Sequence, residues 1–225
     1  MSFQKNYEML KFACEKLEEL ADEVVFVGGA TTCLYVDEQI ADEIRPTEDV
    51  DCTIEIANKN EYDFFQAKLR AKGFSHDTSK GAPICRFKFH DLLVLDVMPN
   101  DPKILGFSNS WYNEGIKNKV LAKIAHKEIY IFPLPYFLAS KFEAYNGRGK
   151  NDPRFSSDLE DIILVIDSIE KFDLAKYPMS DKLKKYLSEM AQLFLSDKFI
   201  IEAIGGFLNG KQEKINKVNQ RLKSF

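Results

Sequence analysis

The chain has 225 residues, which suits one large domain or two small ones. Its hydrophobic content of 45% allows a packed core, and its formal net charge of −4 gives no overall basic field for nucleic acid. The four cysteines form no C-x-x-C pair and stand at no zinc-ligand spacing, so we expect buried thiols. No apolar run nears the ~18 residues of a membrane span, and no signal-peptide pattern opens the chain, so we expect a cytoplasmic protein.

Helices and strands are predicted to alternate in the first half of the chain. Apolar residues at helical spacing indicate an amphipathic first helix, and β-rich runs bounded by Gly, Asn or Pro indicate strands. The expected elements are helices over 4–22, 30–40 and 61–72, strands over 24–27, 49–56, 84–89 and 92–98, and a polar loop over 74–82.

The second half is predicted to be mostly helical. The expected elements are a helical or mixed segment over 111–125, a strand over 127–132, helices over 136–145 and 156–169, and helices after Pro178 that are interrupted near Gly205-Gly206 and Gly210. The fold class is therefore α/β (α+β), with a small mixed sheet flanked by helices. We expect an α/β domain over 1–132 and a mostly helical domain over 133–225.

Two adjacent glycines, Gly28 and Gly29, follow the strand predicted over 24–27. A glycine pair at a strand-to-helix turn lets backbone N–H groups approach a ligand closely, and the start of a helix suits a phosphate. The alternative is a tight turn that binds nothing. Asp49 and Asp51 lie two residues apart on the next strand, so they share a face and can bind a divalent cation. The alternative for this pair is the solvated face of an edge strand.

A third carboxylate, Asp96, interrupts the apolar run over 92–98. A carboxylate in a core-like strand is costly unless it is paired, neutralised or metal-bound. If this strand lies beside the one that carries Asp49 and Asp51, three carboxylates converge and require a cation, for which Mg²⁺ is the natural choice. The alternative is a structural salt bridge between Asp96 and Arg86 or Lys88.

Two cations lie on the apolar stripe of the helix predicted over 136–145 and its continuation. Lys141 and Arg148 stand at helical spacing from Leu134, Phe137 and Leu138. Cations on an inward face need an anion, and a triphosphate or the aspartate cluster would serve. The alternative is that both side chains extend from a half-buried face to water.

Three motifs in this order resemble the DNA polymerase β-like nucleotidyltransferase superfamily. They are Val-Gly-Gly-Ala at 27–30, Arg-Pro-Thr-Glu-Asp-Val-Asp at 45–51 and Leu-Asp-Val at 95–97. Within the superfamily the chain is similar to the AbiEii-type nucleotidyltransferases, many of which are toxins of toxin–antitoxin or phage-defence systems. The block from Phe137 to Gly149, followed by Ser157-Asp158-Leu-Glu-Asp161-Ile, is similar to that family's second signature.

The resemblance implies a role for each matched residue. Gly28, Gly29 and Thr31 would hold the triphosphate of an NTP, and Lys141 would neutralise it. Asp49, Asp51 and Asp96 would bind Mg²⁺, with Asp96 also acting as, or positioning, the base. The second-signature residues with a less defined role are Arg148, Asp158 and Asp161. For Asp158 the alternative is a favourable position near a helix N-terminus.

The activity that the resemblance implies is transfer of NMP from an NTP to a hydroxyl, which could belong to tRNA or another RNA, and regulation by an antitoxin protein. The basic C-terminal run Lys211–Lys223 is either a solvated helix face or an RNA-contacting edge. Transfer to a small molecule, as in antibiotic-modifying enzymes, is the second hypothesis, and the net charge of −4 favours it. A catalytically silent nucleotide-binding module is the third. The three histidines do not cluster and are assigned no role.

Overall fold

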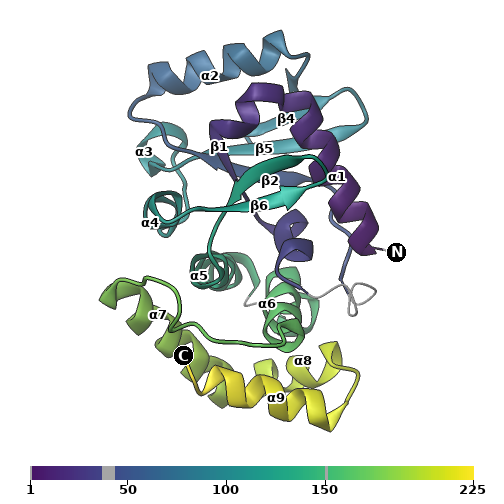
Figure 1. Cartoon of the computed structure of the whole chain (residues 1–225), viewed down its shortest axis with the longest axis vertical. Helices are drawn as coiled ribbons and strands as arrows, with labels where there is room; N and C mark the ends of the chain where they lie inside the picture. Colours follow the sequence, from purple (N-terminus) through teal and green to yellow (C-terminus); the bar gives the residue numbers. More distant parts are fainter. Residues whose placement is uncertain (1, 37–43, 150–151) are drawn as a thin grey trace.

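The computed structural model describes residues 2–36, 44–149 and 152–225, and these form a sheet flanked by helices (Figure 1). The strands are β1 (Val24–Val27), β2 (Val50–Ile54), β3 (Ser75–His76), β4 (Arg86–Phe89), β5 (Leu93–Pro99), β6 (Val120–Ile124) and β7 (Lys127–Ile131). Their order in the sheet is β3-β4-β5-β2-β1-β7-β6. The pairs β2–β5 and β1–β7 are parallel and the other neighbours are antiparallel, so the sheet is mixed.

Helices cover the sheet and extend beyond it. They are α1 (Ser2–Leu17), α2 (Lys59–Ala71), α3 (Pro102–Leu105), α4 (Tyr112–Lys117), α5 (Leu134–Ala144), α6 (Ser157–Ser168), α7 (Asp181–Ser196), α8 (Lys198–Phe207) and α9 (Gln212–Leu222). Short 3₁₀ helices span Glu18–Asp22, Gly29–Leu34 and Pro153–Phe155, and a π-helix spans Tyr145–Gly149. Helices α5 and α6 lie between the sheet and the group formed by α7, α8 and α9 (Figure 1).

The alternation of side chains along β1 divides the core in two. Val24 and Phe26 belong to the core cluster that contains buried residues of α1 and α2, whereas Val25 and Val27 belong to the cluster that contains buried residues of α5, α6 and α7. All four strand residues are buried. The face of the sheet that carries Val25 and Val27 is therefore the face toward α5 and α6.

Most predicted elements are confirmed, and the differences have local causes. The segment over 74–82 was expected to be a loop, but it contains the two-residue edge strand β3. The mixed segment over 111–125 resolves into α4 and the edge strand β6. The helix expected over 30–40 is a 3₁₀ helix from Gly29 to Leu34, and its predicted end at Ile40 lies outside the described residues.

The interruption expected near Gly205-Gly206 lies just after them, because α8 continues through both glycines and ends at Phe207. A further break lies at Asp197, whose side chain accepts hydrogen bonds from the backbone N–H groups of Phe199 and Ile200 and so caps α8. Gly210, with φ of +66°, does lie at the turn between α8 and α9 as expected. The Asp197 cap thus starts α8, and the packing of the apolar residues of α8 keeps the segment helical in spite of the two glycines.

Part of the basic C-terminal run is used within the fold, while Lys211 and Lys223 are exposed. Lys214 Nζ and Lys217 Nζ lie 3.1 and 2.5 Å from the carboxylate of Asp167, which is fully buried on α6. The Arg221 guanidinium donates to the backbone carbonyls of Ile166 and Asp167 at the end of α6. These cations attach α9 to α6.

Across the described ranges, no helix combines the length and the apolar character needed to cross a bilayer.

A pair of glycine substitutions tests the packing of the helices. Gly205→Ala should raise the free energy of unfolding by about 0.5–1 kcal/mol, because Gly205 lies within α8 and an added Cβ meets nothing within 4 Å. Gly115→Ala in α4 should lower it by roughly 1–3 kcal/mol, because its Cβ would come within 2.6 Å of the buried Phe132 ring. Urea unfolding monitored by circular dichroism measures both. Equal effects would contradict the packing described here.

Candidate functional site

One row of side chains crosses four neighbouring strands. Asp51 on β2 lies opposite Val27 on β1 and beside Asp96 on β5, and Asp96 lies opposite Arg86 on β4. Residues in register on neighbouring strands project to the same face of a sheet. Since Val27 faces α5 and α6, the carboxylates of Asp51 and Asp96 project toward the same helices. The convergence expected of these two strands is present, and the edge-strand alternative is wrong because β2 lies inside the sheet.

Arg86 is the cation that this cluster contains. Its Nε and Nη2 atoms donate to the two oxygens of Asp96, each at 2.8 Å, and Nη2 also donates to Asp49 Oδ2 at 2.7 Å. The salt-bridge alternative for Asp96 is thus present with Arg86, whereas Lys88 pairs with Asp77. Across residues 2–36, 44–149 and 152–225, no three Asp, Glu, His or Cys side chains are grouped as ligands of a single ion.

The turn after β1 fits closely against Asp51. Gly28 has φ of +75°, a conformation that favours glycine, and a Cβ there would lie 2.0 Å from Asp51 Oδ2. The hydroxyl of Thr31, which is fully buried, donates to the Gly28 carbonyl at 2.9 Å. The structure therefore places Thr31 as a residue that fixes the turn, with its hydroxyl already engaged by the backbone.

Asp51 has an unusual electrostatic environment. Burial, and then the neighbouring carboxylates of Asp49 and Asp96, raise the pKa of Asp51 to about 7. Lys141 and Arg148 act in the opposite direction on this pKa, so both cations lie within electrostatic reach of the carboxylate cluster. Arg86 binds Asp49 and Asp96 but not Asp51. With its raised pKa, Asp51 loses its proton only near neutral pH.

A second charged network lies on the helices that face this cluster. Lys141 on α5 is 4% exposed, and its Nζ lies 3.2 Å from Asp158 Oδ1 and 2.6 Å from Asp161 Oδ2 on α6. Burial lowers the pKa of Lys141, but Asp161 and Asp158 together raise it above its ordinary value. Lys141 therefore stays charged inside the protein and links α5 to α6.

Two arginines complete this network from opposite sides. Arg45 binds both oxygens of Asp161 at 3.0 and 3.1 Å, and Arg148 binds both oxygens of Asp158 at 2.9 and 3.2 Å. Both pairs have the two-point geometry in which a guanidinium recognises a carboxylate. Three cations are thus held by two carboxylates, so the network, which we call the cationic network, carries an excess positive charge.

The geometry of the chain after α5 brings Arg148 to this position. Residues Tyr145–Gly149 form a π-helix, a rare element that often occurs at functional sites. The Arg148 side chain is 73% exposed while it binds Asp158, so part of the guanidinium faces solvent. The structure thus places Lys141 inside the network and Arg148 at its surface, although both stood on one predicted stripe.

Two functional candidates, Arg45 and Arg86, were assigned no site role from the sequence. An added Cβ on Gly29 would lie 2.8 Å from Arg45 Nη2, so this guanidinium packs directly against the glycine turn. Its position inside the motif 45–51 was a usable signal. Arg86 is found only from the strand register, since no spacing in the sequence connects it to Asp49.

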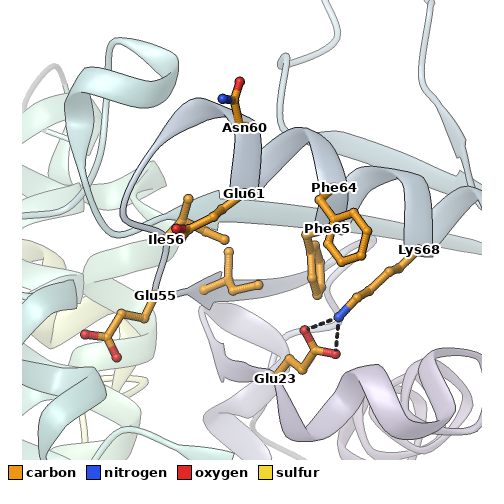
Figure 2. A pocket seen from close by; sticks show the side chains of 9 residues that line it. Glu23, Glu55, Ile56, Asn60, Glu61, Phe64, Phe65 and Lys68 are labelled. Atoms are coloured by element: carbon orange, nitrogen blue, oxygen red, sulfur yellow. Dashed lines mark hydrogen bonds and ion pairs between the residues drawn. The ribbon is translucent and has the colours of Figure 1, made fainter.

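A separate cavity of about 510 Å³ lies beside α2, and Figure 2 shows its lining. Two of its three carboxylates are engaged in local structure: Glu23 pairs with Lys68 at 2.8 Å, and Glu61 accepts from the backbone N–H of Ala57 just before α2. The aspartates of the row across the sheet do not line it. This cavity is therefore distinct from the candidate site.

Comparison with solved structures identifies the architecture. The chain is similar to the crystal structure of an antigenic nucleotidyltransferase-like protein from Paracoccidioides brasiliensis, with a TM-score of 0.51 and 17% sequence identity over 97% of this chain and 94% of that one. The chain has a nucleotidyltransferase-like fold. In sequence, no protein-family model and no curated protein matches it. The mixed sheet followed by a helical C-terminal region confirms the predicted fold class.

Asp51 should make the stability of this nucleotidyltransferase-like fold depend on pH. Its pKa is raised in the folded chain, so stability is lost as pH rises from about 4, where the unfolded chain ionises, to about 7. In metal-free buffer, Asp51→Asn should therefore raise the free energy of unfolding at pH 8 by roughly 1–3 kcal/mol and change it little at pH 4. Urea unfolding at the two pH values measures this difference.

Asp49→Asn is the matched control for this experiment. The Asp49 carboxylate accepts from Arg86 at 2.7 Å and from the Thr47 hydroxyl at 3.1 Å, so its neutralisation removes an ion pair and should not stabilise the chain at pH 8. A gain for Asp51→Asn that is the same at both pH values would show that ionisation of Asp51 is not its cause.

Lys141 should be essential for stability. Lys141→Met removes a cation from between two buried carboxylates, and we expect the free energy of unfolding to fall by roughly 3 kcal/mol. Lys72→Met is the control, because Lys72 also contacts two carboxylates, those of Glu18 and Glu19, but on the surface, where water screens the ion pairs and the loss should be much smaller. If guanidinium unfolding shows equal losses, Lys141 does not have the structural role described here.

Proposed function

We propose that this chain is a Mg²⁺-dependent nucleotidyltransferase that moves NMP from an NTP to a hydroxyl acceptor. The observation that carries the proposal is the row of Asp51 and Asp96 on neighbouring strands, with the Gly28 turn packed against Asp51. The cationic network faces this row and carries the opposite excess charge. A carboxylate cluster beside a cationic cluster suits a magnesium-bound triphosphate.

The carboxylates offer oxygen donors of the kind that a divalent cation takes, although in the described residues, with Arg86 bound to two of them, they are not grouped as the ligands of a single ion. Asp49, Asp51 and Asp96 offer only oxygen donors, which Mg²⁺ prefers, and the cluster holds more carboxylates than the single Arg86 can neutralise. These three residues would hold Mg²⁺, which when bound would offset the negative charge of the triphosphate and of the attacking oxygen. The resemblance in sequence gives the same three residues this role.

The cationic network supports the phosphate side of the proposed reaction. Lys141 holds Asp158 and Asp161 in place, and these hold the arginines Arg148 and Arg45. The turn at Gly28 and Gly29 lies between Arg45 and Asp51, so backbone N–H groups there could approach a phosphate. We assign Lys141 a long-range electrostatic and positioning role and give the arginines direct contact with phosphate.

The chemistry proposed is an in-line displacement at the α-phosphorus. The acceptor oxygen forms a bond to this phosphorus, the bond from phosphorus to the pyrophosphate oxygen breaks, and Asp96 accepts the proton of the hydroxyl. The rate depends on positioning and on neutralisation of charge, because the protein forms no covalent intermediate in this scheme.

The acceptor and the biological role are the finer parts of the proposal. The motifs resemble AbiEii-type enzymes, so we propose a toxin-like role with an antitoxin partner and tRNA or another RNA as the acceptor. Lys214, Lys217 and Arg221 are engaged by α6, which leaves fewer cations of the C-terminal run for an RNA-contacting edge. A small hydroxylated molecule is therefore the second candidate acceptor.

The test is transfer of label from each α-labelled NTP in the presence of Mg²⁺, with total RNA or a panel of small alcohols and aminoglycosides as acceptors. We expect label on an acceptor together with pyrophosphate release, both reduced at least ~100-fold by Asp51→Asn. Asp91→Asn is the matched control, because Asp91 is exposed in the turn between β4 and β5 and should leave the rate unchanged.

The pattern of labelling decides among the hypotheses. Label on an RNA band identifies an RNA acceptor, and label on a small molecule identifies the antibiotic-modifying type of reaction. Binding of NTP without release of pyrophosphate in the presence of any acceptor would overturn the proposal in favour of a silent nucleotide-binding module.

A further inference from the structure

Arg86 occupies the carboxylates to which the proposed function assigns the metal. Both oxygens of Asp96 accept from Arg86, and so does Oδ2 of Asp49. The remaining oxygen of Asp49, Oδ1, accepts from the Thr47 hydroxyl at 3.1 Å. Each of the four oxygens thus has a donor from the chain itself. The two carboxylates are satisfied without an ion, which is unusual for a pair that must bind one.

The backbone fixes this contact. Arg86 is the first residue of β4 and lies directly opposite Asp96 in the antiparallel pair of β4 and β5. A guanidinium that binds one carboxylate at two points and a second at one point is well ordered, because charge-assisted bonds of this kind are strong. A cation that binds through the lone pairs that Arg86 now occupies must replace these bonds.

The Arg86 side chain also has room to move away from the carboxylates into solvent. The Arg86 side chain is 25% exposed, and β3, which lies beside β4 at the edge of the sheet, spans only Ser75–His76. A side chain at the start of a strand and near the sheet edge can rotate into water without disturbing the core. Arg86 can therefore leave the carboxylates while the strand pairing remains intact.

We propose that Arg86 is a built-in competitor of the metal: its guanidinium holds Asp49 and Asp96 until Mg²⁺ displaces it. This inference rests on the proposed function, because it assigns the same carboxylates to Mg²⁺. It adds that the chain sets its own metal affinity, since binding of the ion breaks three hydrogen bonds to Arg86. It also explains how the fold tolerates like charges side by side before the metal arrives.

The test compares Mg²⁺ binding to the full chain without nucleotide, by isothermal titration calorimetry. Arg86→Gln should lower the Kd for Mg²⁺ about tenfold, which corresponds to ~1.4 kcal/mol, because the competitor is gone. Arg86→Lys keeps the charge but loses the two-point geometry, so its Kd should lie between the two. Lys88→Gln is the matched control, since Lys88 lies on the same strand, pairs with Asp77 and should leave the Kd unchanged.

Thermal unfolding gives a second measurement that does not depend on activity. In metal-free buffer Arg86→Gln should have a lower Tm than the unchanged chain, because Asp49 and Asp96 then lose the cation that binds both of them. Saturating Mg²⁺ should remove most of this difference. If Arg86→Gln fails to fold without metal, the ranking of Kd values for the unchanged chain and Arg86→Lys still tests the proposal.

The outcomes separate this inference from the proposed function. A Kd that rises in both Arg86 variants would overturn competition and make Arg86 an organiser of the metal site. Transfer activity in the unchanged chain with equal Kd values for all variants would overturn the inference alone. A chain and variants that bind no Mg²⁺, with or without NTP, would overturn the metal-dependent function itself.

Discussion

The parallel pairing of β2 with β5 is the constraint on which this structure depends. It places Asp51 directly beside Asp96 on the neighbouring strand. Two ionised carboxylates in such positions repel each other where little water screens them. Three surrounding features reduce this repulsion. Arg86 enters from the next strand, Asp51 keeps its proton to neutral pH, and the cationic network lies on the helices that face the row. A fold selected for stability alone would place apolar residues here.

Both charged clusters use side chains from segments far apart in the sequence. Arg45 and Asp161 are separated by more than half of the chain, yet they meet against the glycine turn. Lys141 joins α5 to α6 in the same network. The sheet and the first two helices of the C-terminal half therefore form one electrostatic unit, in which a change on either side alters the potential at Asp51.

Sequence patterns predicted the parts of the fold that local chemistry determines. Alternation and apolar runs identified β1, β2, β4, β5 and β7, and the helix predicted over 156–169 corresponds to α6. The edge strand β6 was not separated from α4, because its exposed residues lack a hydrophobic alternation. Asp49, Asp51 and Asp96 were identified as a group. Arg86 was recognised only as a possible salt-bridge partner, since its place among them depends on strand register and not on spacing.

Helix α6 carries acidic residues near both ends, and this has a consequence for any shortened version of the protein. Asp158 and Asp161 near its start bind the cations of the site, while Asp167 near its end binds Lys214 and Lys217 of α9. Removal of the last helix would leave Asp167 buried in the core without these two cations. Asp167 lies on α6, the same helix whose Asp158 and Asp161 bind Lys141. The terminal helix is therefore part of the scaffold of the candidate site, and a shortened chain that is to keep this site must retain it.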